Sequence, residues 1–449
     1  MSAAVVRDAL ARAKERGACA ADAVLAESEA RETRVRIDEI EVVKQERSRT
    51  LGVRAFVRAP NGLRVAVGST TDLAPATVAR LVDDTVELAH ATAPDPDAGL
   101  PAGGFAAVAP ALGLLDPADR AVPLEARIAD ARRAEAAARG VDARVTNSSG
   151  SEASSSFAHV VLGNSEGFLG EYESASHGLF TMPIAAENGA MQTDYWLSFG
   201  RTLAALEDPA TVGRRAAERT IRRLGSRRVK TARVPVVFEA ITARSLLGHL
   251  ASCVVGSSLY RKASFLAGRL GERIAGDAIT IIDDGRRPGG LASRPFDGEG
   301  LPTRRNVVVD RGVLKSWLLD SYAARKLGLA PTGNAARSPG GGPGSSTTNF
   351  WLEPGTSSLA EMIAGTERGL LCTYLFGHGF DPVTGDFSRG AAGLWIEDGR
   401  IAFPVDEITI AGNLGEMLAS IDAIGREVEW LGGVASPPIR ISALTVAGE

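Results

Sequence analysis

The chain begins with a helical pattern of apolar residues and then changes to alternating strands. Val6, Leu10 and Ala13 form one apolar stripe near the N-terminus, which is typical of an amphipathic helix. Asn61-Gly62 lies between two alternating apolar and polar runs, and this pattern predicts a β-hairpin. The Pro-, Gly- and Asp-rich stretch 93–104 predicts a linker. The predicted elements before it are helices over 3–16 and 75–91 and strands over 34–43, 51–58 and 62–68.

The rest of the chain combines helices with many short strands. Thr146–Gly150 and Gly163–Gly167 are similar turn-like sequences, and the alternation around them predicts an antiparallel meander over 141–182. A short buried strand at 234–238 precedes a helix over 241–255. The other predicted elements are helices over 123–139 and 209–225, strands over 305–319, 369–376, 391–398 and 401–405, and a flexible glycine-rich loop over 333–349.

These patterns predict an α+β fold that is rich in antiparallel sheet. Strands and helices do not alternate regularly, which argues against a Rossmann fold or a TIM barrel. The breaks in composition divide the chain into three predicted domains. They are an N-terminal α+β domain at 1–103, a central meander with a basic helix at 104–230, and a larger, β-rich and barrel-like C-terminal domain at 231–449.

Composition excludes several classes of protein. Hydrophobic residues make up 45% of the 449 residues and the net charge is −4, so nothing draws the whole chain to nucleic acid or to an anionic membrane. The three cysteines are far apart and unpaired in pattern, which indicates neither a disulfide framework nor a zinc knuckle. Arg7 and Asp8 interrupt any signal peptide, and no apolar run is long enough to span a bilayer. We therefore expect a soluble, cytoplasmic protein.

Common catalytic motifs receive little support. Gly163–Gly167 matches the G-x-S-x-G pattern of a nucleophile elbow, but a strand rather than a helix is predicted after it, so we interpret it as a hairpin turn. None of the five histidines belongs to an HExxH motif, and no phosphate-binding glycine loop is present. His249 and Cys253 lie four residues apart on one predicted helix, and two ligands make a poor zinc site. A packed histidine and a buried thiol are the favoured interpretation.

A run of arginines between residues 214 and 230 forms the most basic part of the chain. Such a run is capable of binding a polyanion. The run lacks interleaved aromatic residues, and its arginines are spread around all sides of the predicted helix. A solvated or subunit-facing surface is therefore favoured over a nucleic-acid site.

Two loops combine glycines with charged side chains. The two loops are Ser293–Gly300 and Asp381–Gly393. Each contains carboxylates, an arginine, and glycines whose backbone carries no side chain to cover it. Uncovered backbone would let an extended peptide approach closely, and plain turns between strands are an equally favoured interpretation. The candidate peptide-binding residues are Asp297, Gly298, Glu299, Gly300, Arg389, Gly390 and Gly393.

Seven segments spread over the chain resemble the TldD/PmbA family of metallopeptidases, and within it the PmbA (TldE) branch. The segments are 191–196, 246–250, 260–265, 293–300, 318–322, 381–393 and 407–413. The resemblance implies a heterodimer of a TldD-type and a TldE-type subunit, which acts as a zinc metallopeptidase on unfolded or flexible peptides and matures some of them.

This chain departs from the family pattern at the metal site. The TldD branch carries HExxxH on the helix that corresponds to 241–255, and a distant cysteine is its third ligand. Gly248, His249 and Cys253 occupy the positions of the first histidine, the glutamate and the second histidine, and 431–436 contains no cysteine. The resemblance therefore implies no zinc in this chain, zinc on a TldD-type partner, and a role here in completing the peptide cavity.

Two other functions stay open at this point. One is a non-enzymatic regulator that binds a protein or DNA target through the 214–230 face, since the PmbA name is associated with gyrase inhibition. The other is a self-sufficient hydrolase with an atypical site built from His249, Cys253 or His378. A homodimer is a possible assembly when the partner is absent.

Overall fold

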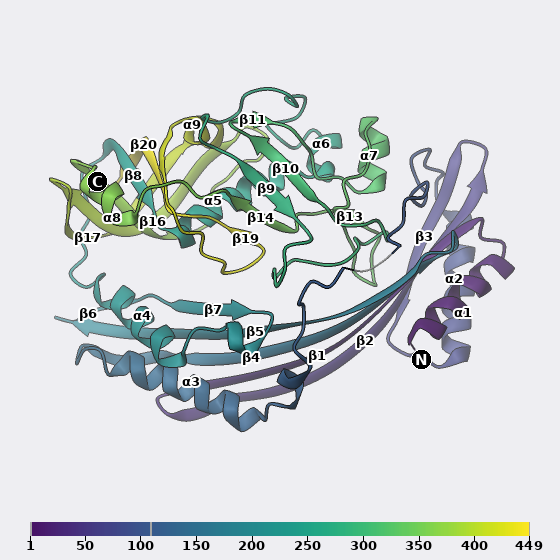
Figure 1. Ribbon diagram of the computed structural model, residues 1–449, viewed down its shortest axis with the longest axis horizontal. Helices are drawn as coiled ribbons and strands as arrows, with labels where there is room; N and C mark the ends of the chain where they lie inside the picture. Colours follow the sequence, from purple (N-terminus) through teal and green to yellow (C-terminus); the bar gives the residue numbers. More distant parts are fainter. Residues whose placement is uncertain (1, 108–109, 449) are drawn as a thin grey trace.

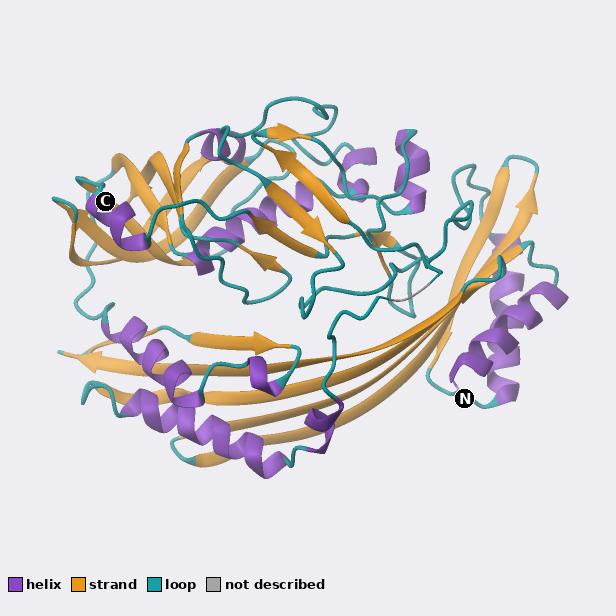
Figure 2. Ribbon diagram, in the orientation of Figure 1, coloured by secondary structure: helices purple, strands orange, loops and turns teal. Residues whose placement is uncertain are grey.

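A computed structural model describes residues 2–107 and 110–448, and a long curved sheet runs along one side of the molecule (Figures 1 and 2). Its strands are antiparallel in the order β3-β2-β1-β4-β5-β6, and β7 pairs with β5. The strands are β1 (Ala20–Arg36), β2 (Glu39–Ala59), β3 (Gly62–Thr70), β4 (Val145–Asn164), β5 (Leu169–Glu187), β6 (Ala190–Thr193) and β7 (Trp196–Gly200).

Alternation along these strands gives the long sheet two different faces. Leu25 lies opposite Leu51 on β2 and Val161 on β4, and all three pack in one core with the N-terminal helices. Val24 and Leu162 point the other way and pack against Phe296 of the C-terminal region. The helices that cover the first face are α1 (Ser2–Glu15), α2 (Pro75–Ala91), α3 (Leu124–Arg139) and α4 (Pro209–Ile221).

The C-terminal region is built around a closed barrel. Its strand order is β17-β16-β15-β8-β20, and pairing of β17 with β20 closes the ring, while β18 extends the sheet. These strands are β8 (Ala232–Phe238), β15 (Arg368–Phe376), β16 (Asp386–Glu397), β17 (Arg400–Asn413), β18 (Ile421–Ile424) and β20 (Ile439–Ala447).

A second sheet and five helices complete this region. The sheet has the order β11-β10-β9-β14-β19, and α5 (Ala240–Cys253) packs on it and on the barrel strands β8 and β15. The remaining elements are β9 (Ile281–Asp284), β10 (Arg305–Asp310), β11 (Val313–Leu314), β12 (Ala335–Ala336), β13 (Gly344–Ser345), β14 (Asn349–Leu352), β19 (Val434–Ala435), α6 (Gly256–Tyr260), α7 (Ser321–Leu327), α8 (Leu359–Ala364) and α9 (Leu414–Ala419).

The structure confirms the α+β class and the antiparallel sheets, and it corrects several local predictions. The predicted strand 34–43 contains the turn between β1 and β2, where Ile37 and Asp38 have positive φ angles of 49° and 66°. Thr146–Gly150 lies inside β4 as an irregular stretch, because pairing with the neighbouring strands overrides its local preference for a turn. Gly163–Gly167 spans the turn between β4 and β5, which confirms the hairpin interpretation.

Two more observations bear on how the chain is organised. The predicted flexible loop 333–349 contains the short antiparallel pair β12–β13 and the first residue of β14. Strands from both the 1–103 and the 104–230 segments share the long sheet, and the predicted domain boundaries stay a prediction.

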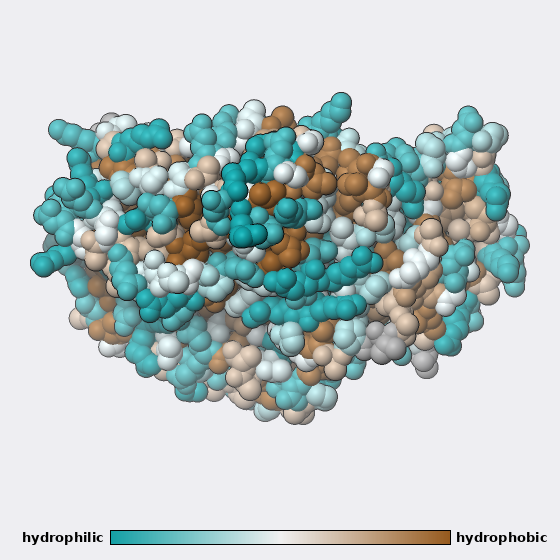
Figure 3. All heavy atoms as spheres, turned by 45° about the horizontal axis from the view of Figure 1, so that its top comes forward, coloured by the Kyte–Doolittle hydropathy of each residue, from teal (hydrophilic) through white to brown (hydrophobic). Residues whose placement is uncertain are grey.

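The outer surface shows no continuous apolar area on the face in Figure 3, where hydrophobic residues gather in separate groups among hydrophilic ones. Across residues 2–107 and 110–448, no helix has both the length and the apolar character needed to cross a membrane.

Candidate functional site

Helix α5 separates the candidate metal residues onto two sides. Leu246 and Leu250 anchor its inner face in the main core of the C-terminal region. Cys253 follows them inward and has no exposed surface, and burial raises the pKa of its thiol to about 11. Gly248 and His249 lie on the half-buried outer side. The thiol and the imidazole therefore do not converge on one ligand.

His249 is held as a neutral imidazole. Its ring stacks on Phe380 with 4.5 Å between centroids, and Phe387 lies edge-on at 6.0 Å. Burial, and after it the nearby guanidinium of Arg389, lower the pKa of His249 to about 4. Its Nε2 atom is buried without a hydrogen-bond partner.

A zinc ion does not fit these residues. A catalytic zinc needs about three protein ligands, whereas Gly248 offers no donor and Cys253 faces the core. The one remaining donor, His249, lies beside a positively charged arginine, which repels a cation. Within the described residues, no group of three His, Cys, Asp or Glu side chains is placed to hold a metal.

Arg389 of β16 lies near His249, and Gly390 is the next residue of the same strand. Arg389 donates a hydrogen bond from Nη1 to Ser245 Oγ at 2.7 Å, which ties β16 to α5. A Cβ atom at Gly390 would lie 2.1 Å from the ring of Phe376, so only glycine leaves room for that ring. The structure thus brings together His249 and Arg389 from the set of candidate residues, and it places Gly390 against Phe376.

A row of aromatic rings leads from the long sheet to this point. Phe180 on β5 lies 5.6 Å from Tyr195, which lies 6.2 Å from Tyr374 on β15, and Tyr374 lies 6.3 Å from Phe376, centroid to centroid. Phe376 is 43% exposed at the end of the row. The aromatic row offers flat apolar surface beside a guanidinium, a combination suited to varied peptide side chains.

The acidic loop 293–300 lies elsewhere and has an internal role. Asp297 is 1% exposed, and its carboxylate accepts hydrogen bonds from the backbone N–H groups of Glu299, Leu301 and Ala335. Glu299 is 4% exposed and accepts a hydrogen bond from the N–H of Ser321. Burial, with the neighbouring charge of Asp297, raises the pKa of Glu299 to about 7.

The exposed glycine backbone that we predicted is largely closed by the chain itself, which corrects that part of the argument. A Cβ atom at Gly300 would lie 2.6 Å from the ring of Phe168, and one at Gly393 would lie 2.0 Å from a carbonyl oxygen of β15. Gly298 is half-buried against the segment after β12. These glycines allow elements of the fold to approach one another, and Gly390 alone borders the aromatic row.

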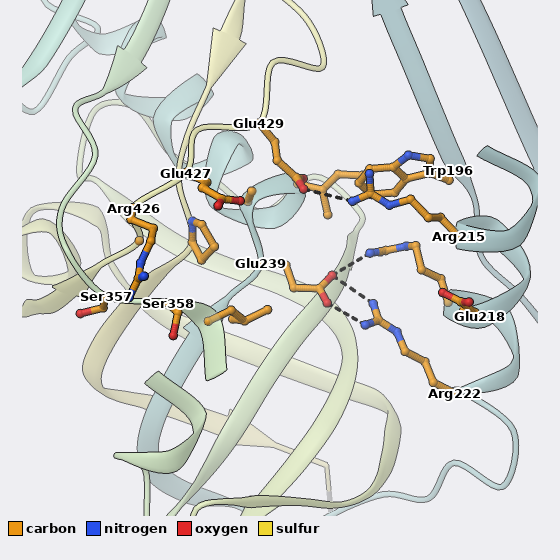
Figure 4. Close-up of a pocket in the computed structure, with 16 residues that line it drawn as sticks. Trp196, Arg215, Glu218, Arg222, Glu239, Ser357, Ser358, Arg426, Glu427 and Glu429 are labelled. Carbon is orange, nitrogen blue, oxygen red and sulfur yellow. Dashed lines mark hydrogen bonds and ion pairs between the residues drawn. The ribbon is translucent and has the colours of Figure 1, made fainter. Parts of the chain in front are cut away.

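The prediction of a solvated or subunit-facing basic surface at 214–230 is wrong for its central arginines. Arg219 and Arg223 are each 8% exposed, and Arg219 and Arg222 both pair with Glu239 at 2.7 Å (Figure 4). The sequence pattern did not reveal the acidic partners because they lie far along the chain. Arg223, for example, pairs with Asp406 at 3.0 Å.

These ion pairs border a polar cavity of about 480 Å³ between α4 and the C-terminal region (Figure 4). Trp196 forms one wall and carries Arg215 stacked at 3.7 Å from its ring centroid. Glu429 closes another side and pairs with Arg215 at 3.3 Å. The ion pairs that line the cavity join α4 to the C-terminal region, and its described lining residues include no histidine and no cysteine.

A serine, a histidine and an aspartate in contact were missed by the sequence analysis. Ser155 Oγ lies 2.8 Å from His177 Nδ1, and Asp119 Oδ2 lies 3.3 Å from His177 Nε2. The His177 side chain has no exposed surface, and Phe157 covers it edge-on at 5.6 Å. Burial lowers the pKa of His177. The arrangement resembles a hydrolase triad in its contacts, but substrate has no access to it.

Three family models match consecutive parts of the chain. They describe the PmbA/TldA metallopeptidase domain 1 over residues 21–89, the central domain over 117–224 and the C-terminal domain over 231–448. The chain is 39% identical to "Metalloprotease PmbA" of Escherichia coli over 92% of its own length and 89% of that protein. It is 34% identical to a PmbA homolog of Haemophilus influenzae over 92% and 89% of the two chains.

Solved structures share the complete fold. A putative modulator of DNA gyrase from Bacteroides thetaiotaomicron superposes with a TM-score of 0.91 at 27% identity, covering 99% of this chain and 98% of the other. TldE from Thermococcus kodakarensis superposes with a TM-score of 0.89 at 22% identity, covering 99% and 100%. The second likeness is one of fold.

Proposed function

The chain belongs to the PmbA/TldD metallopeptidase family, and from that premise we propose that it is the TldE-type subunit of a two-subunit zinc metallopeptidase. In this role it supports proteolysis of flexible peptides without carrying the zinc. The zinc and the general base belong to a TldD-type partner.

The main support for this proposal is the lack, among the described residues, of converging metal-ligand side chains on the outer side of α5. On the helix where the family's catalytic branch has its ligands, this chain offers one imidazole, His249, stacked on Phe380 at 4.5 Å. Arg389 lies beside that imidazole, and Cys253 faces the core. Assembly of a metal-activated water from these residues alone is disfavoured, because it needs several converging donors.

The surface around α5 supports a role in holding peptide. Phe376 offers an exposed ring that lies over Gly390, and Arg389, the next residue on β16, adds a cation. In the long sheet, β6 and β7 each pair only with β5 among the described strands, so neither has a second strand partner there. Added strands are held through the backbone and tolerate varied side chains.

The proposal is tested by metal content and peptidase activity of the purified chain, alone and co-purified with a TldD-type subunit, on an unfolded casein substrate. We expect metal-free, inactive protein alone and chelator-sensitive hydrolysis in the complex. Within the complex, Arg389→Ala should raise KM several-fold, whereas Arg400→Ala, an exposed arginine on β17, should leave it unchanged. Chelator-sensitive hydrolysis by the chain alone, or one bound zinc per isolated chain, would refute the proposal.

A further inference from the structure

A small, partly open cavity lies between the long sheet and the C-terminal region, away from the α5 surface. Its volume is about 70 Å³, and we call it the Arg294/Arg337 pocket after the two arginines that line it together with Asp297. Val24 and Leu162 of the sheet and Phe296 form apolar walls, so little water reaches it from those sides.

Both arginines hold hydrogen-bond donors that nothing in the described chain accepts. The side chain of Arg337 is 1% exposed and pairs through Nη1 with Asp22, but its buried Nε and Nη2 have no partner in the described chain. Arg294 has buried Nε and Nη2 atoms without partners, and no carboxylate within the described residues forms an ion pair with it. Buried donors on charged groups are costly to leave unpaired, so each needs an acceptor.

The nearby carboxylates either already accept hydrogen bonds from other groups or are partly protonated. Asp22 is shared between Arg54 and Arg337. Asp297 accepts three backbone N–H groups. Burial raises the pKa of Glu299 to about 7, so this carboxyl is only partly ionised at neutral pH. None of these groups supplies the missing acceptor.

The local charge also leaves room for an anion. Arg201 adds a fourth guanidinium near Tyr172 of the pocket wall, and the acceptors of Arg201 are backbone carbonyls. Asp283 is the remaining carboxylate near Arg294, and burial raises its pKa to about 6. Within the described residues, neither Arg201 nor Arg294 forms an ion pair with a carboxylate.

We propose that the Arg294/Arg337 pocket binds a small oxyanion, a carboxylate or phosphate group, held between the two guanidinium forks. The planar fork of arginine matches two oxygens of such a group, and Tyr172 lies in the same wall as a further donor. The volume suits one small anion, since a single water needs only about 10–15 Å³ of the same kind of space. This site is independent of the peptidase role proposed above.

The position of the pocket gives the anion a structural consequence. Val24 and Leu162 belong to the long sheet, whereas Arg294 and Arg337 belong to the C-terminal region. An anion that bridges the two guanidinium groups there fixes that junction, and a ligand that binds only the folded state raises the unfolding temperature.

The test measures phosphate and acetate binding by isothermal titration calorimetry to the full chain prepared without oxyanions, at constant ionic strength set with sodium chloride. Arg294→Gln should weaken binding by at least about tenfold, and Arg294→Lys should recover part of it, because a charged hydrogen bond is lost and then partly restored. Arg286→Gln, an exposed arginine of the same loop, is the matched control. Circular dichroism checks that each variant is folded.

Two further arms identify the source and the place of the anion. If a peptide with a free C-terminus competes with phosphate and its amidated form does not, the site binds peptide carboxylates. If neither peptide competes with phosphate, the site binds free anions. Crystals soaked in selenate should show anomalous density between Arg294 and Arg337. Water-sized density in the pocket, or binding that Arg294→Gln leaves unchanged, would overturn the proposal.

Discussion

Replacing Glu239 by glutamine tests whether the arginines of α4 are structural rather than solvated. Glu239 precedes α5 and is 8% exposed. It accepts two hydrogen bonds from Arg222, at 2.7 and 3.0 Å, and one from Arg219 at 2.7 Å. These contacts join α4 of the central segment to the C-terminal region.

Glutamine keeps the shape of this side chain and removes its charge. Its amide nitrogen would also face a guanidinium, which places donor against donor. Breaking one partner of a buried ion pair costs about 3–5 kcal/mol. Arg219 keeps Asp194 at 3.4 Å, and Arg222 remains partly exposed, so we expect the lower end, about 3 kcal/mol.

The assay is urea unfolding at pH 7, compared with Glu353→Gln as the control. Glu353 forms an exposed pair with Arg305 at 3.1 Å, and its loss should cost less than about 1 kcal/mol. Equal losses in the two variants would refute the assignment of α4 to a buried junction.

A pH series adds a second check on the same pair. Burial opposes ionisation of Glu239, but the guanidinium groups of Arg222 and Arg219 outweigh it and lower its pKa. The stabilisation is therefore complete above the ordinary glutamate pKa of about 4.3 and is lost as the pH falls through the lower folded value. The difference between the native chain and Glu239→Gln should shrink on acidification; a difference that grows would contradict this sign.

Three other predictions follow from the packing. Gly393→Ala should abolish soluble expression, since its Cβ would lie 2.0 Å from a carbonyl oxygen of β15, whereas Gly342→Ala, with nothing within 4 Å, should express normally. Iodoacetamide at pH 7 should label Cys19 and leave the two buried cysteines unmodified, so mass spectrometry should find one adduct per chain. The NMR titration midpoint of His249 should lie near 4 and rise in Arg389→Gln; an unchanged midpoint would exclude the guanidinium as a cause.

Local chemistry explains where prediction from the sequence succeeded. The helix predicted over 75–91 matches α2, because Pro75 begins it and the apolar spacing places Val78 and Val82 on one buried face. The hairpin at Asn61-Gly62 also forms as expected, joining β2 to β3, since its turn chemistry lies within a few residues.

Predictions that depended on distant partners went wrong or stayed incomplete. Arg219 finds Glu239 only because α4 packs against the start of α5. Thr146–Gly150 has turn-like composition but lies in β4, where it pairs with β5. The contacts of His177 with Ser155 and Asp119 join two strands and a 3₁₀ helix, so no short motif announces them.

The sequence by itself determined the antiparallel α+β class, several elements such as the helix over 75–91, and the resemblance that the family comparison confirms, because periodicity, turn chemistry and long motifs are local properties of the chain. Only the tertiary structure decided which charges are paired, which glycines are closed and which candidate residues meet. His249 and Arg389 lie close together because β16 approaches α5 at Arg389, which donates a hydrogen bond to Ser245. Burial and long-range pairing are set by how elements pack, and the energies of these polar groups depend on that packing.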